Sequence, residues 1–196
     1  LWIAYGAWTR WSQSPQSSWN RWYYAAAVLA LFGGLAYGEM MTAGFMQQSY
    51  GYLRLAHIHL GLIGCLTLVI VGVVFTLLPA SLNSSLSSLT LTQPVLILML
   101  LGVAALFGGF MNSSVPIEIA AGGLLFTGGA LWAATLFRTW VASTHDGTAA
   151  SDHLLIGAFF FLFTIILGIL AGLNSLSSPP VMPFGTLHLI AYTHMA

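Results

Sequence analysis

A long apolar run follows Arg54 and continues without a charged residue to Pro79. At about 1.5 Å per residue, a helix of this length crosses the roughly 30 Å hydrocarbon core of a membrane. The whole chain agrees, because 58% of its 196 residues are hydrophobic and only 4% are charged, whereas a soluble domain has about 25% charged residues. The sequence therefore predicts an integral membrane protein whose partner is the lipid bilayer. Its net charge of zero favours no nucleic-acid partner.

Apolar segments alternate with polar or proline-containing loops, which predicts an all-α, polytopic transmembrane helix bundle of about six helices. The expected spans are residues 23–41, 53–79, 94–111, 117–137, 153–173 and 183–196. Residues 1–22 are rich in Trp and contain two Arg residues, so we expect this segment to lie in the headgroup layer. The sequence begins without Met and ends inside an apolar segment. We therefore expect the chain to be incomplete at one or both ends.

Four arginines are the only permanent positive charges available to orient the chain in the membrane. Arg10, Arg21 and Arg138 fall on the side of the amino terminus, and Arg54 falls on the opposite side. Positive residues are concentrated in cytoplasmic loops of membrane proteins. We therefore expect a cytoplasmic amino terminus, with His57 near the outer face.

A stripe of mostly small residues begins at His57. In an α-helix one side would carry His57, Gly61, Gly64, Cys65, Leu68 and Gly72. Small residues let a neighbouring helix or a flat ring approach the backbone, and an imidazole is a metal ligand. The stripe therefore predicts either a haem bound by His57, or a helix-packing seam beside a hydrogen-bonded histidine. His59 lies about 200° from His57 around the same helix, so the two rings cannot face one metal.

The sequence also contains a weak internal repeat. With an offset of 135 residues, 32–36 align with 167–171 and 55–61 align with 190–196, so that His59 falls on His194. The first span then matches the fifth and the second matches the sixth, as expected for a four-helix repeat. The repeat favours His59 as a ligand, whereas the stripe favours His57. The sequence alone leaves this choice open.

The segment Arg54-x-x-His57-x-His59, followed by Gly64 and Pro79, resembles the second helix of the haem-copper oxidase subunit I superfamily. The C-type cytochrome oxidases and nitric oxide reductases are the most similar branch, and Tyr192-Thr193-His194 resembles their sixth helix. The resemblance covers the amino-terminal half of that fold. It implies that His57 binds haem b, that His194 binds copper or non-haem iron, and that cytochrome subunits are partners. It also implies a bacterial or archaeal inner membrane.

The chain departs from that family at His59, where an Asn is usual, and it ends before the histidines of the later helices. Those histidines supply the opposite haem ligand and the remaining metal ligands, so these residues alone cannot assemble an oxygen- or nitric-oxide-reducing centre. Whether the chain belongs to an enzyme stays open at this point. Gly61 and Gly64 would border the haem, and Arg54 is a candidate partner of a haem propionate or an anchor among the headgroups.

The expected function is thus a haem-binding membrane subunit that passes electrons within a respiratory or nitric-oxide-reducing complex. A first alternative is a non-catalytic structural subunit that anchors a redox complex to the membrane. A second alternative is a small-solute transporter, because repeats and glycine-rich bundles are common in transporters. Known transporter repeats often invert their topology, whereas a four-helix shift preserves it.

Overall fold

A computed structural model describes residues 19–45, 50–144 and 147–176. Every regular element in these ranges is a helix, which confirms the predicted all-α class. The elements are α2 (Asn20–Thr42), α3 (Tyr50–His59), the π-helix η2 (Leu60–Thr67), α4 (Leu68–Ser81), α5 (Thr92–Met111), α6 (Val115–Ala142) and α7 (Ala149–Ser175). Because α3, η2 and α4 are continuous, they form one rod from Tyr50 to Ser81.

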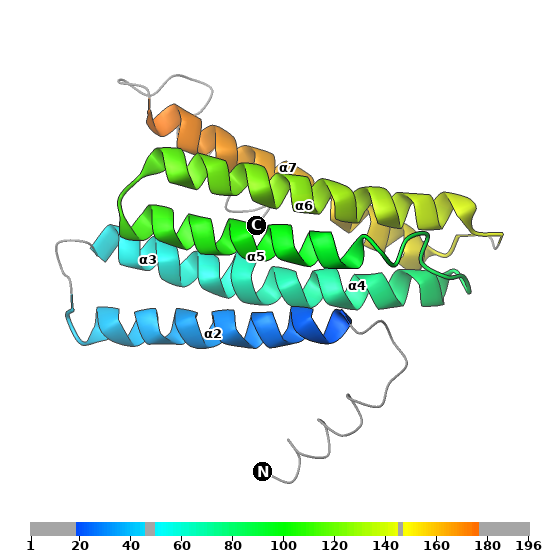
Figure 1. The fold of residues 1–196 in the computed structure, drawn as a ribbon, viewed down its shortest axis with the longest axis horizontal. Coiled ribbons are helices and arrows are strands. Elements are labelled where there is room, and N and C mark those ends of the chain that lie inside the picture. The colour runs from blue at the N-terminus through cyan, green and yellow to red at the C-terminus, as the bar shows by residue number, and fades with distance from the viewer. Residues whose placement is uncertain (1–18, 46–49, 145–146, 177–196) are drawn as a thin grey trace, which may run out of the picture.

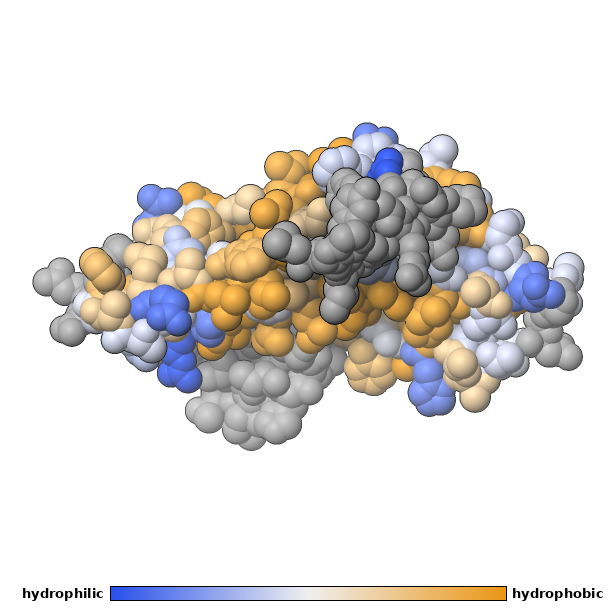
Figure 2. Space-filling view, turned by 90° about the horizontal axis from the view of Figure 1, so that it is seen from below, coloured by the Kyte–Doolittle hydropathy of each residue, from blue (hydrophilic) through white to orange (hydrophobic). Residues whose placement is uncertain are grey.

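Five helices in the described part of the chain are long and apolar enough to cross a membrane: α2, the α3–η2–α4 rod, α5, α6 and α7. They coincide with the first five predicted spans, and the chain is an integral membrane protein. The sixth span, residues 190–196 of the repeat and residues 1–18 lie outside the described residues, whereas residues 167–171 of the repeat lie in α7. Figure 2 shows apolar residues over the middle of one long face, with hydrophilic residues mainly toward its two ends.

Successive helices run in opposite directions along one long axis, as Figure 1 shows. Helix α2 packs along the α3–η2–α4 rod, α5 packs on α3 and η2, and α6 packs on both α5 and α7. One end of the bundle therefore carries the start of α2 and the α4–α5 loop. The other end carries α3, whose last turn contains both histidines, and the α5–α6 turn.

Side chains from α4, α5, α6 and α7 fill the apolar core around Leu78, Val95 and Leu136, each fully buried. Helix α2 joins this core through Tyr23, whose buried hydroxyl donates a 2.7 Å hydrogen bond to the backbone carbonyl of Thr92. The Asn20 amide donates to the Thr76 hydroxyl over 2.7 Å. These two bonds hold α2 to the start of α5 and to α4, so its position along the rod is defined.

Residues 138–152, the polar interval between the fourth and fifth predicted spans, are only partly a loop. Helix α6 continues to Ala142 and α7 begins at Ala149. Thr148 and Ser151 form a capping box, in which the Ser151 amide donates to the Thr148 hydroxyl and the Thr148 amide donates to the Ser151 hydroxyl. Paired caps of this kind satisfy amides at the start of a helix. Polar residues that read as loop in the sequence thus belong to a helix terminus.

Candidate functional site

The His57 ring points from α3 toward α2. Its Nδ1 lies 2.7 Å from the backbone carbonyl oxygen of Gly34. A carbonyl can only accept a hydrogen bond, so Nδ1 carries the proton and Nε2 of the neutral ring keeps a lone pair. The sequence did not identify a hydrogen-bond partner for this ring, and the fold supplies one from the neighbouring helix.

An apolar groove lies between α2 and the junction of α3 with η2, beside His57. Its volume is about 240 Å³, and it is lined by His57, Gly34 and Gly61 together with Leu31, Leu35, Ile58 and Leu62. A Cβ added to Gly61 would meet no described neighbour within 4 Å. This end of the predicted stripe is therefore open to a ligand.

The remainder of the stripe is covered by α2. A Cβ added to Gly64 would lie 2.8 Å from the Cβ of Ala30, and one added to Gly72 would lie 2.9 Å from the Cβ of Tyr23. Contacts this close are possible only for glycine, which lets the two backbones approach each other. Gly64 and Gly72 therefore belong to a helix-packing seam. The flat group that the sequence analysis expected would have room beside Gly61 and none beside Gly64.

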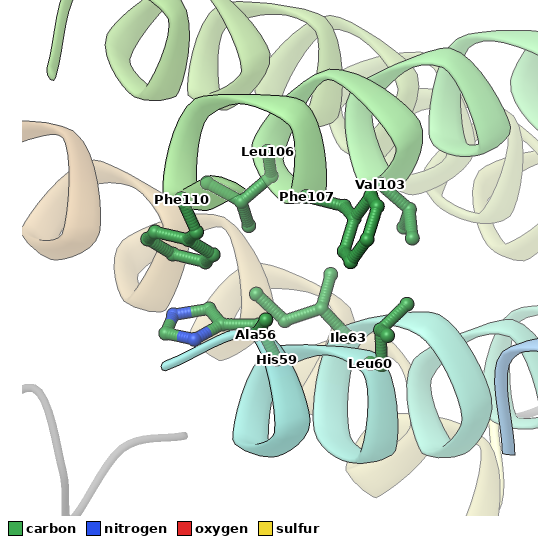
Figure 3. A pocket seen from close by; sticks show the side chains of 8 residues that line it. All are labelled: Ala56, His59, Leu60, Ile63, Val103, Leu106, Phe107 and Phe110. Atoms are coloured by element: carbon green, nitrogen blue, oxygen red, sulfur yellow. The ribbon is translucent and has the colours of Figure 1, made fainter. Parts of the chain in front are cut away.

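The His59 ring faces α5 instead of α2. Its ring centroid lies 4.8 Å from that of Phe110, and its Nδ1 lies 2.8 Å from the Leu55 carbonyl oxygen one turn earlier. The adjoining cavity has a volume of only about 10 Å³, which is space for about one water molecule. Figure 3 shows Phe110 lying over the ring and Ile63 beside it. A haem does not fit at His59 in this packing.

The two histidines contact different helices, as expected from their separation of about 200° around α3. Arg54 is exposed, one turn before His57. His194 lies outside the described residues. Within the described residues, no group of three or more His, Cys, Asp or Glu side chains is placed to bind a metal ion. The described part of the site thus consists of one histidine, its carbonyl partner and a groove.

Two residues beside His57 were not singled out from the sequence: Gly34, whose carbonyl accepts from the ring, and Gly38, where an added Cβ would lie 3.2 Å from Cε1 of the ring. They lie four residues apart on α2, a small-xxx-small spacing that is typical of close helix contacts in membranes. That spacing is a signal by which the two glycines could have been identified from the sequence. The π-helical form of η2 left no comparable pattern in the sequence.

The fit of a haem to these residues is partial. His57 offers a nitrogen ligand with an oriented ring, and Gly34 and Gly61 leave space beside it. The groove is smaller than the roughly 300–1,000 Å³ of pockets that enclose a ligand, and His57 is the only side chain in its described lining that can ligate iron. These residues fit one axial position and one edge of a porphyrin.

No protein-family model, curated protein or solved structure matches this chain. The function is therefore argued from the geometry around His57.

Proposed function

We propose that this chain is a haem-binding integral membrane subunit in which Nε2 of His57 is one axial ligand of haem b. The observation that carries the proposal is the 2.7 Å hydrogen bond from Nδ1 of His57 to the Gly34 carbonyl, beside an open groove. Metal-ligating histidines almost always donate their other ring N–H to a carbonyl, carboxylate or water. His57 has this arrangement, and His59, enclosed beside Phe110, lacks the adjoining space.

Each residue has a defined role in this proposal. His57 holds the iron, the Gly34 carbonyl orients the imidazole, and Gly61 leaves room for the macrocycle. Arg54 lies one turn before His57 and is exposed, so its guanidinium is available to a propionate. A bound haem supplies one-electron transfer, and the protein sets its potential through the axial ligand and the apolar surroundings.

The proposed context is a respiratory or nitric-oxide-reducing membrane complex with cytochrome partner subunits, which would supply the opposite axial ligand. A copper or non-haem iron ion at His194 belongs to the same proposal. This context follows from the resemblance of residues 54–79 and 192–194 to the haem-copper oxidase superfamily.

A reduced-minus-oxidised absorbance spectrum of the purified protein tests the haem. We expect the sharp bands of a low-spin haem b in the unmodified protein and in His59→Ala, and their loss in His57→Ala. Both substitutions remove an imidazole from α3, so His59→Ala controls for damage to the helix. A colourless preparation that also takes up no added haem would refute the proposal, and so would equal spectra from the two variants.

One observation favours a structural subunit as the second candidate. Helix α2 covers the stripe at Gly64 and Gly72, so most of the stripe already serves helix packing. A subunit of this kind would anchor redox partners without holding a cofactor. It would then be colourless, and His57→Ala would alter only its stability.

A further inference from the structure

We infer that Gly38 is a positioning residue, which holds the His57 ring in the tautomer with a proton on Nδ1 and a lone pair on Nε2. The effect of Gly38 on haem binding rests on the proposed function. Its effect on the tautomer of His57 is independent of that function. A Cβ added to Gly38 would lie 3.2 Å from Cε1 and 3.4 Å from Nδ1 of His57. The ring thus lies against the position that a side chain of residue 38 would occupy.

Gly34 and Gly38 contribute differently to this contact. Gly34 provides the carbonyl that accepts from Nδ1 at 2.7 Å. A Cβ added to Gly34 would make only ordinary contacts, at 3.6 Å from both the Gly61 nitrogen and the His57 carbonyl oxygen. The amide of residue 38 donates to the same carbonyl within the α-helix, and a carbonyl oxygen has two lone pairs for two such donors. Gly34 therefore supplies the acceptor, and Gly38 supplies the space through which the ring reaches it.

A methyl group at position 38 would displace the ring by a few tenths of an ångström, because a contact of 3.2 Å is tighter than nine in ten real Cβ contacts. The displacement lengthens the hydrogen bond from Nδ1, and the preference for a proton on that nitrogen weakens. A proton that moves to Nε2 occupies the lone pair needed for a metal bond. The size of residue 38 therefore controls whether His57 is a competent ligand.

Gly38→Ala tests this inference, with Gly33→Ala as its matched control. Both substitutions add one methyl group to α2 and give the same gain in helix propensity. A Cβ at Gly33 would meet only the Cδ1 of Leu60, at an ordinary 3.5 Å. The two variants differ in their contact with His57, so a difference between them reports on the ring.

The first readout is the ¹⁵N spectrum of the full chain labelled at histidine, in detergent and without added haem, with the His57 signals assigned from His57→Gln. We expect a protonated Nδ1 and an unprotonated Nε2 in the unmodified protein and in Gly33→Ala. In Gly38→Ala the population protonated at Nε2 should rise. A proton on Nε2 in the unmodified protein, or identical spectra from the two glycine variants, would overturn the inference. Gly38→Ser, which places the same Cβ, serves if Gly38→Ala does not fold.

The second readout is the affinity for added haem. Loss of a hydrogen-bond partner behind a ligand typically lowers metal affinity by about 10-fold to 100-fold, so we expect at least a 10-fold loss in Gly38→Ala. Gly33→Ala should stay within about twofold. If the tautomer is as stated and no variant binds haem, the proposed function fails and the positioning role stands. If the unmodified protein binds haem and Gly38→Ala behaves like Gly33→Ala, the positioning role fails.

Discussion

His57 and His59 are two positions apart on one helix and have different surroundings. His57 donates to the carbonyl of Gly34 beside a groove of about 240 Å³, whereas His59 packs on Phe110 beside a cavity of about 10 Å³. An imidazole in a membrane protein needs a polar partner, because an unsatisfied polar group in hydrocarbon is costly. Both rings have one, so the space beside His57 is what distinguishes it as the candidate ligand.

The glycines of the stripe are not equivalent, and substitution should separate them. A methyl group at Gly72 would lie 2.9 Å from the Cβ of Tyr23. Tyr23 cannot move aside easily, because it is fully buried and hydrogen-bonded to Thr92. We expect Gly72→Ala to lower the free energy of unfolding by about 1–3 kcal/mol, as overpacking does. Denaturant titration in detergent measures this value.

Gly157→Ala in α7 is the control for that experiment. A Cβ there would meet no described neighbour within 4 Å, so the better helix propensity of Ala should stabilise α7 by up to about 1 kcal/mol. Equal effects of the two substitutions would contradict the seam between α2 and the rod.

Among the helices, the rod is distinguished by the π-helical segment η2, which begins directly after His59. A π-helix bonds each amide to the carbonyl five residues earlier. The Thr67 hydroxyl bridges the same interval, donating to the Leu62 carbonyl at 3.1 Å. A π turn holds one residue more than an α turn. The rod can therefore contain an extra residue in η2 without a rotation of α3 about the helix axis relative to α4. It thereby maintains the directions in which both histidines point.

Deleting one residue should therefore be tolerated inside η2 and harmful outside it. Removing Leu66, whose side chain is 48% exposed, lets η2 become α-helical while α3 keeps its orientation. Removing Ile70, which is 44% exposed and lies in α4, turns everything before it by about 100°. We expect the melting temperature of the Leu66 deletion variant to be close to that of the unmodified protein. We expect the Ile70 deletion variant to aggregate. Size-exclusion chromatography and thermal melting in detergent distinguish the two outcomes, and equal loss of the folded state would argue against this role of η2.

The bundle as a whole has two chemically different ends. Arg21, near the start of α2, and Arg138, near the end of α6, belong to one end. Arg54, in α3, belongs to the other end, together with Glu39 and Glu118. From the positive-inside rule we expect the first end to face the cytoplasm. This expected orientation would place the candidate haem site toward the outer face of the membrane.

Cysteine labelling in intact cells tests this orientation. On a Cys65→Ala background, Ser85→Cys and Ser113→Cys each place one thiol in an exposed position of a loop, at opposite ends of the bundle. A membrane-impermeant maleimide should label Ser113→Cys directly and Ser85→Cys only after permeabilisation. The reverse pattern would place His57 near the cytoplasmic face.

The sequence alone determined that this protein is an all-α membrane bundle and where its first five spans lie. Hydropathy and span length depend on neighbours along the chain, so they can be read without a fold. Helix ends were less predictable: residues 138–152 read as one polar loop, although Thr148 and Ser151 cap α7 within it. The separation of His57 and His59 around their helix also followed directly from the sequence.

Only the tertiary structure decided what each side of the rod faces. The predicted stripe is closed by α2 at Gly64 and Gly72 and open beside Gly61, and His57 reaches a carbonyl 23 positions earlier in the chain. These properties depend on which backbone lies opposite and how closely it approaches. The periodicity of one helix shows which residues share a face of that helix. It does not show which neighbouring helix packs on that face.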